Sequence, residues 1–177
     1  MAHRLFISFS GRSGGNCDQI ARFLATADDQ IVCFRDLQAH PCSGCHYECF
    51  SNKCPYRADG IYALYSQMTI YDQIVLIVPM YCGSPSSLYF MFNERGQDYF
   101  MHNDTYEEIL RRLYIIGIYG SRETSPDFIP CLSKWFDGTT ICNHVLGIER
   151  HLYGQQLQDS VLDVPEVQHA LRDFLLQ

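Results

Sequence analysis

Residues 5–17 read Leu5-Phe6-Ile7-Ser8-Phe9-Ser10-Gly11-Arg12-Ser13-Gly14-Gly15-Asn16-Cys17, an apolar run followed at once by a loop of small residues. The apolar run is typical of a buried strand, and the residues after Asn16 have the spacing of a helix. A strand, a short loop and a helix start present free backbone N–H groups to an anion. The spacing matches neither the dinucleotide nor the nucleoside-triphosphate fingerprint. These residues predict either a phosphate-binding loop or an ordinary strand-to-helix turn.

Further apolar segments along the chain predict a parallel sheet. The clearest is Ile74-Val75-Leu76-Ile77-Val78, which is apolar without alternation, as in a parallel strand covered on both faces. The other predicted strands cover residues 31–34, 114–119 and 140–146. Five strands alternating with helices predict a doubly wound α/β protein with helices on both faces of one sheet. We find no linker or internal repeat and expect residues 1–177 to form a single domain.

The composition excludes several classes of protein. The 177 residues, 47% of them hydrophobic, are enough for one domain with a sizeable core. A net charge of -7 argues against a general nucleic-acid binder. No apolar run approaches the ~18 residues of a membrane span, and the N-terminal run is too short for a secretory signal. We therefore expect a cytoplasmic protein, in which nine cysteines indicate metal or redox chemistry rather than disulfides.

Three loops rich in Gly, Ser and Pro follow predicted strands, at residues 8–17, 79–87 and 120–125. In a doubly wound sheet, ligands bind beyond the carboxyl ends of the strands. Arg12 could therefore hold a phosphate, and Tyr81 could contact a ring, because each lies just beyond a predicted strand. The alternatives are a solvated Arg12 and core aromatic side chains at Tyr81 and Tyr119.

The first two loops resemble those of a known family. Residues 10–16 are similar to the phosphate loop of the NADPH-dependent FMN reductases, and Pro79-x-Tyr81-x-Gly83 resembles their ring-contacting loop. The resemblance implies a flavodoxin-like fold, bound FMN and NAD(P)H as a possible electron donor. It implies cofactor contacts from Ser10, Arg12, Ser13, Gly15, Asn16, Cys17, Pro79, Met80, Tyr81, Cys82, Gly83, Tyr119 and Gly120. Cys17 departs from the family's Thr or Ser, so phosphate binding would rest more on backbone N–H groups, Ser10 and Arg12.

A cysteine-rich loop at residues 41–55 contains Cys42, Cys45, Cys49 and Cys54. It resembles the compact motif of the iron–sulfur flavoproteins in the same family, which implies that these four thiolates hold a [4Fe–4S] cluster. The gaps of two, three and four residues differ from that family's usual spacing. A zinc site and a loop of free thiols therefore remain open alternatives.

These features together predict an FMN-dependent oxidoreductase or electron-transfer flavoprotein, and the resemblance of the cysteine-rich loop adds an iron–sulfur cluster. Its partner would be a small molecule or a redox protein, and the resemblance implies a homodimer or homotetramer. The sequence identifies no catalytic acid or base. The alternative is a non-catalytic binding protein in which a flavodoxin-like fold carries a structural zinc or thiol loop.

Overall fold

The predicted strands form a five-stranded parallel sheet in the computed structural model, which describes residues 3–135 and 140–176. The strands are β1 (Arg4–Ser8), β2 (Gln30–Cys33), β3 (Gln73–Tyr81), β5 (Leu113–Tyr119) and β8 (Val145–Glu149), in the order β2-β1-β3-β5-β8. The short strand β4 (Ser84–Pro85) pairs antiparallel with the end of β3. This order is that of the flavodoxin-like fold, so the predicted fold class is confirmed.

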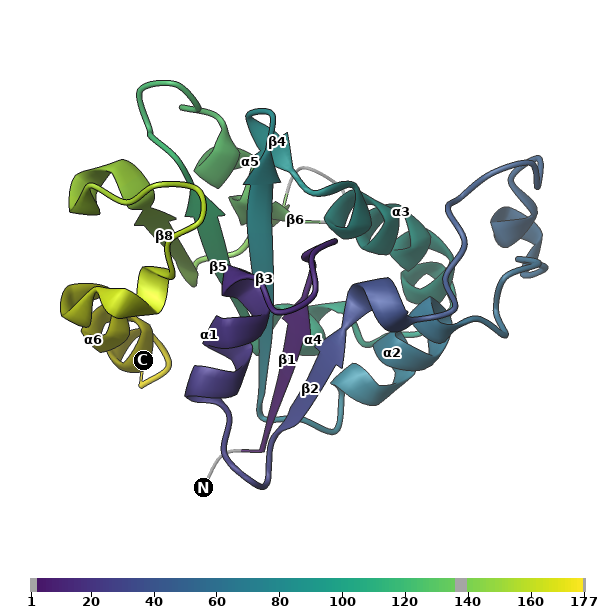
Figure 1. Ribbon diagram of the computed structural model, residues 1–177. Coiled ribbons are helices and arrows are strands. Elements are labelled where there is room, and N and C mark those ends of the chain that lie inside the picture. Colours follow the sequence, from purple (N-terminus) through teal and green to yellow (C-terminus); the bar gives the residue numbers. More distant parts are fainter. Residues whose placement is uncertain (1–2, 136–139, 177) are drawn as a thin grey trace.

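Alternating side chains divide the core into two layers, because successive residues of a strand point to opposite faces. Leu5 and Leu76 belong to one buried cluster, whereas Phe6 and Val75 belong to the other. The first cluster is covered by α2 (Gly60–Met68), α3 (Ser87–His102), α4 (Tyr106–Arg111) and α5 (Phe128–Ser133). The second is covered by α1 (Asn16–Leu24) and α6 (Pro165–Phe174). Figure 1 shows these helices on opposite sides of the sheet.

The central strand β3 supplies the most deeply buried part of the sheet. All five side chains from Ile74 to Val78 are fully buried. Each such aliphatic side chain stabilises the fold by about 1.5–3 kcal/mol relative to an exposed one. The unbroken apolar run is thus explained by helices on both faces, as the sequence predicts.

The last sheet strand lies later in the chain than the predicted residues 140–146. Thr140–Ile141 forms β7, which pairs antiparallel with β6 (Lys134–Trp135), and the sheet strand is β8. Gly147 of β8 pairs with Gly117 of β5, directly beneath α5. A Cβ atom on Gly147 would come within 2.9 Å of Ile129 Cδ1. The glycine pair gives α5 room to pack on the sheet, which favours a strand centred on Gly147.

The other elements among the described residues are four short 3-10 helices, η1 (Phe34–Asp36), η2 (Glu48–Ser51), η3 (Arg150–Tyr153) and η4 (Val161–Asp163). Within residues 3–135 and 140–176, no helix combines the length and the apolar character that crossing a membrane requires.

From β1 the chain crosses to β2 on one side of the sheet and then to β3 on the other. The loops that follow β1 and β3 consequently diverge and open a crevice at the carboxyl ends of these strands.

Candidate functional site

The loop after β1 delivers an uncapped helix N-terminus to this crevice. Gly15 is the N-cap residue of α1, and no side chain accepts a hydrogen bond from the first turn. The Ser10 hydroxyl instead holds the loop together, because it accepts from Arg12 N (3.1 Å) and donates to Arg12 O (3.1 Å). The first backbone N–H groups of a helix lack intrahelical partners. An anion is therefore the natural partner for this end of α1.

A buried ion pair fixes the shape of the same loop. Asp18 is 1% exposed and accepts hydrogen bonds from Arg35, from the Ser8 hydroxyl and from Gly14 N. Burial alone would raise the pKa of Asp18, but these hydrogen bonds outweigh it and hold the pKa below its ordinary value. Arg35 thus neutralises a carboxylate that would otherwise repel an anion at α1.

Two predicted phosphate ligands differ in how they are placed. Arg12 is exposed, and its guanidinium makes no hydrogen bond or ion pair to the described part of the chain. Cys17 is buried, and burial together with the nearby Asp18 raises the pKa of its thiol. Cys17 is therefore a neutral thiol at physiological pH, whereas Arg12 is a cation free to meet a ligand.

The loop after β3 is a tight hairpin. Tyr81 pairs with Ser84, and the two residues between them, Cys82 and Gly83, have φ of 50° and 81°. Positive φ at both positions is the geometry of a type I′ turn. The turn leaves Tyr81 38% exposed at the end of the sheet. Ser86 then joins the two loops, because its hydroxyl donates to the Phe9 carbonyl oxygen at 2.8 Å.

The three predicted loops meet around one cavity of about 610 Å³. This volume lies in the range of small-molecule sites, about 300–1,000 Å³. The predicted residues that line it are Ser10, Arg12, Gly15, Asn16, Cys17, Pro79, Met80, Tyr81, Cys82, Tyr119 and Gly120. Ser13 and Gly83 lie outside this lining. The predicted site residues are therefore largely brought together, although their contacts with a cofactor stay predictions.

One wall of the cavity comes from a segment that the sequence analysis missed, residues 157–160. Asn16 holds this segment against α1, because its Nδ2 donates to Asp159 O at 3.2 Å and its Oδ1 accepts from Val161 N at 2.9 Å. The Asn16 side chain thus orders this wall, Asn16 also lines the cavity, and its contact with a cofactor stays a prediction. Arg150 also lines the cavity. It directly follows β8, so a correct strand boundary would have marked it as a candidate.

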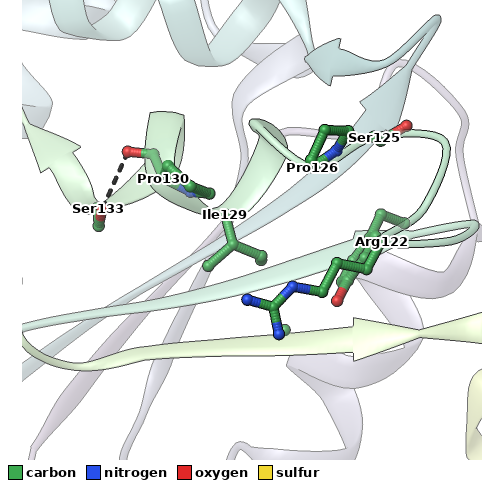
Figure 2. Close-up of a pocket in the computed structure, with 8 residues that line it drawn as sticks. Arg122, Ser125, Pro126, Ile129, Pro130 and Ser133 are labelled. Carbon is green, nitrogen blue, oxygen red and sulfur yellow. Dashed lines mark hydrogen bonds between the residues drawn. The ribbon is translucent and has the colours of Figure 1, made fainter.

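A second cavity of about 410 Å³ lies beside the first and shares Tyr119 with it. Figure 2 shows Arg122 extending beneath Ile129 of α5 in this cavity. The Tyr119 hydroxyl donates to Glu149 Oε2 at 3.3 Å, and Arg122 N donates to Glu149 Oε1 at 2.8 Å. Burial and the Glu149 carboxylate both raise the pKa of Tyr119. Tyr119 is therefore uncharged and held in one orientation where it lines both cavities.

The structure does not support the metal centre that the sequence predicts for the cysteine-rich loop. In the part of the chain that the structure describes, which includes all four cysteines, no three His, Cys, Asp or Glu side chains converge as metal ligands. Cys49 is buried on η2, and its carbonyl oxygen lies 2.7 Å from His102 Nε2 of α3, whereas Cys42 is exposed. Cys42 and Cys49, which would have to bind the same metal centre, therefore lie in different environments. This arrangement supports neither the [4Fe–4S] cluster nor the alternative zinc site on Cys42, Cys45, Cys49 and Cys54.

The base of this loop is instead closed by a buried ion pair. Arg95 Nη1 donates to Asp59 Oδ2 at 2.6 Å and to His40 O at 2.7 Å, and its Nη2 donates to Tyr56 O at 3.1 Å. Burial alone would raise the pKa of Asp59, but the hydrogen bonds from Arg95 and the backbone lower it. Arg95 is thus a structural residue of the loop and is remote from the cavity lining.

Comparisons with known proteins give structural relatives alone. No family model matches the chain, and neither does any curated protein sequence. Among solved structures, Trp repressor binding protein from Bacillus subtilis superposes with a TM-score of 0.65 at 16% identity, over 97% of this chain and 98% of that one. An NADH:FMN oxidoreductase in its apo form gives 0.56 at 14% identity, over 99% and 89%. The NAD(P)H:(acceptor) oxidoreductase FerB from Paracoccus denitrificans gives 0.55 at 12% identity, over 99% and 96%.

These neighbours share the flavodoxin-like fold with the chain over nearly its whole length. Two of them carry names of flavin or NAD(P)H oxidoreductases. At identities this low, the similarity shows the fold, and the argument for function has to come from the cavity itself.

Proposed function

We propose that this protein is an FMN-dependent oxidoreductase that takes electrons from NAD(P)H or a protein donor. The observation that carries the proposal is the single cavity enclosed by an uncapped helix N-terminus, Arg12, the half-exposed Tyr81 and the end of β5. An anion-binding end and an aromatic side chain in one cavity match a phosphorylated ring compound. The names of the structural neighbours support the same class of ligand.

Different residues around the cavity would bind the phosphate and the ring of FMN. The first turn of α1 and Arg12 would hold the phosphate, and Tyr81 would pack against the flavin ring beside the backbone of Met80 and Gly120. Bound FMN would supply the hydride and electron chemistry. The protein would position the ring at the sheet edge, and the buried Tyr119 would close the floor without carrying charge.

FMN is favoured over a dinucleotide because the loop is built for one phosphate group. The spacing of its glycines is not that of a dinucleotide fingerprint. A small-molecule or protein acceptor, a homodimer or homotetramer and a cytoplasmic location belong to the same proposal. The last of these rests on the nine cysteines, none of which forms a disulfide within the described chain.

The proposal is tested by identifying the bound cofactor. The purified protein is heated to release its ligand, the ligand is identified by mass, and apoprotein is then titrated separately with FMN, FAD and riboflavin. We expect FMN in the released fraction and tighter binding of FMN than of FAD. Recovery of FAD, or failure to bind FMN after attempted reconstitution, would refute the proposal.

A further inference from the structure

Arg150 is a buried cation in the wall of the cavity, and its charge is not balanced by the protein. The residue is 7% exposed and begins η3, immediately after β8. Its hydrogen bonds run to two neutral acceptors at long distances, from Nη1 to Leu157 O at 3.3 Å and from Nη2 to Asp159 O at 3.4 Å. Its Nε is buried without any hydrogen-bond partner. No carboxylate of the described residues lies within 4.0 Å of its guanidinium nitrogens.

This arrangement is costly unless an anion completes it. A buried charge that lacks a counter-charge and full hydrogen bonding is strongly destabilising. Burial lowers the pKa of Arg150, and the Asp159 carboxylate only partly opposes this effect. The Asp159 carboxylate itself accepts a hydrogen bond from Gln156 N at 2.7 Å. The protein thus holds a guanidinium in a low-dielectric wall without supplying its partner.

The position of Arg150 identifies the part of the cavity where that anion would lie. Arg150 Nη2 and Asn16 Nδ2 donate to the same carbonyl oxygen, Asp159 O. Arg150 is therefore beside the first residue of α1, and both residues line the same cavity. The backbone is held there as well, because His151 N donates to Gly120 O at 3.0 Å.

Two other arginines near the loop have different environments. Arg35 is neutralised by Asp18 at 2.8 Å, and Arg12 is exposed to solvent. Among these three, Arg150 alone is both buried and without an acidic partner in the described chain. Solvent therefore screens the interaction of Arg150 with a bound anion less than that of the exposed Arg12.

We propose that Arg150 is a phosphate ligand of the cavity, which binds the FMN phosphate together with the loop at residues 10–15. This inference rests on the proposed function for the identity of the ligand. The binding of the phosphate group itself can be tested without flavin.

The first experiment compares FMN with riboflavin, which lacks the phosphate. Arg150→Gln retains hydrogen-bond donors for one carbonyl oxygen but removes the charge. We expect it to weaken FMN binding by about tenfold to a hundredfold and to change riboflavin binding by less than about twofold. Arg22→Gln is the matched control, because Arg22 is an exposed arginine on the same helix α1 as the anion-binding end. It should leave both affinities unchanged.

The second experiment uses inorganic phosphate on apoprotein at constant ionic strength, with chloride as the balancing anion. Phosphate should raise the melting temperature of the wild type and of Arg22→Gln, and should raise that of Arg150→Gln by less, because Arg12 and the first turn of α1 remain. Arg150→Lys keeps the charge on a side chain of similar reach, so it should retain a preference for FMN over riboflavin. This variant also provides the comparison if Arg150→Gln does not fold.

The outcomes separate this inference from the proposed function. A wild type that binds neither flavin refutes the proposed function. In that case the melting temperatures measured with phosphate still test whether Arg150 binds a phosphate group. Equal losses of FMN and riboflavin binding, unchanged FMN binding in Arg150→Gln, or equal phosphate protection of wild type and Arg150→Gln would each overturn the inference. Loss of FMN preference in Arg150→Lys would also contradict it.

Discussion

Asp18→Asn should destabilise the protein substantially although it hardly changes the size of the side chain. The carboxylate accepts from two nitrogens of Arg35, from the Ser8 hydroxyl and from Gly14 N. Each carboxylate oxygen accepts from one Arg35 nitrogen, so the NH₂ group of an amide faces an Arg35 donor in either orientation. Removing one partner of a buried ion pair costs about 3–5 kcal/mol. Arg35 keeps 16% of its side-chain surface in water, so we expect a loss near the lower end.

Urea denaturation measures this loss as a change in midpoint at constant slope. A loss of about 3 kcal/mol is a large share of a typical stability of about 5–15 kcal/mol. Asp28→Asn is the matched control, because Asp28 is exposed in the turn between α1 and β2 and undergoes the same chemical change. Its effect should stay within about 0.5 kcal/mol.

A double-mutant cycle with Arg35→Met tests whether the pair itself is responsible. Arg35→Met alone should cost more than Asp18→Asn, because Asp18 is 1% exposed and cannot regain water. The double variant should cost less than the sum of the single variants by at least about 1.5 kcal/mol.

The pH dependence of Asp18→Asn supplies a further test. Because folding lowers the pKa of Asp18, its contribution is present at neutral pH and is lost as the pH falls below about 4. A cost of Asp18→Asn below about 1 kcal/mol, or one that does not change with pH, would refute the reasoning.

Further predictions concern the ligand and two ion pairs. Arg12→Ala should weaken FMN binding by about 1.5–3 kcal/mol, because its guanidinium is free to meet the phosphate; an unchanged dissociation constant in a flavin fluorescence titration would contradict this. Arg95→Leu should lower the free energy of unfolding by about 3–5 kcal/mol, because it leaves Asp59 charged and 4% exposed, and a loss below about 1 kcal/mol in urea would contradict it. For Asp29, burial raises the pKa but bonds from Arg4 and Thr26 bring it to about 2. Asp29 should therefore add about 1–2 kcal/mol to the free energy of unfolding above pH ~4, and this contribution should vanish as the pH falls through ~2. Plots of unfolding free energy against pH that stay parallel for wild type and Arg4→Met in this range would exclude it.

Local patterns in the sequence determined the elements and the edge of the sheet that carries the site. The unbroken apolar run of residues 74–78 predicts a central strand because helices must cover both of its faces, and the structure confirms it. The glycine and serine residues after β1 likewise predict a strand, loop and helix start with free backbone N–H groups, and the structure places Gly15, which has no side chain, at the N-cap of α1. These inferences succeed because each depends on neighbours within a few positions of the chain.

Only the tertiary structure decided which side chains share a space. The amide of Asn16 bonds to residues 159 and 161, which lie far away in the sequence, and this contact brings their segment to the wall of the cavity. Arg150 joins the cavity because β8 ends at Glu149, a boundary that depends on how α5 packs over Gly147 and Gly117. The four cysteines of the 41–55 loop resemble a cluster motif, yet the packing of Cys49 under α3 and the ion pair of Arg95 with Asp59 hold the loop in another shape. Spacing along a chain restricts which groups can meet, whereas burial and long-range hydrogen bonds select the groups that do.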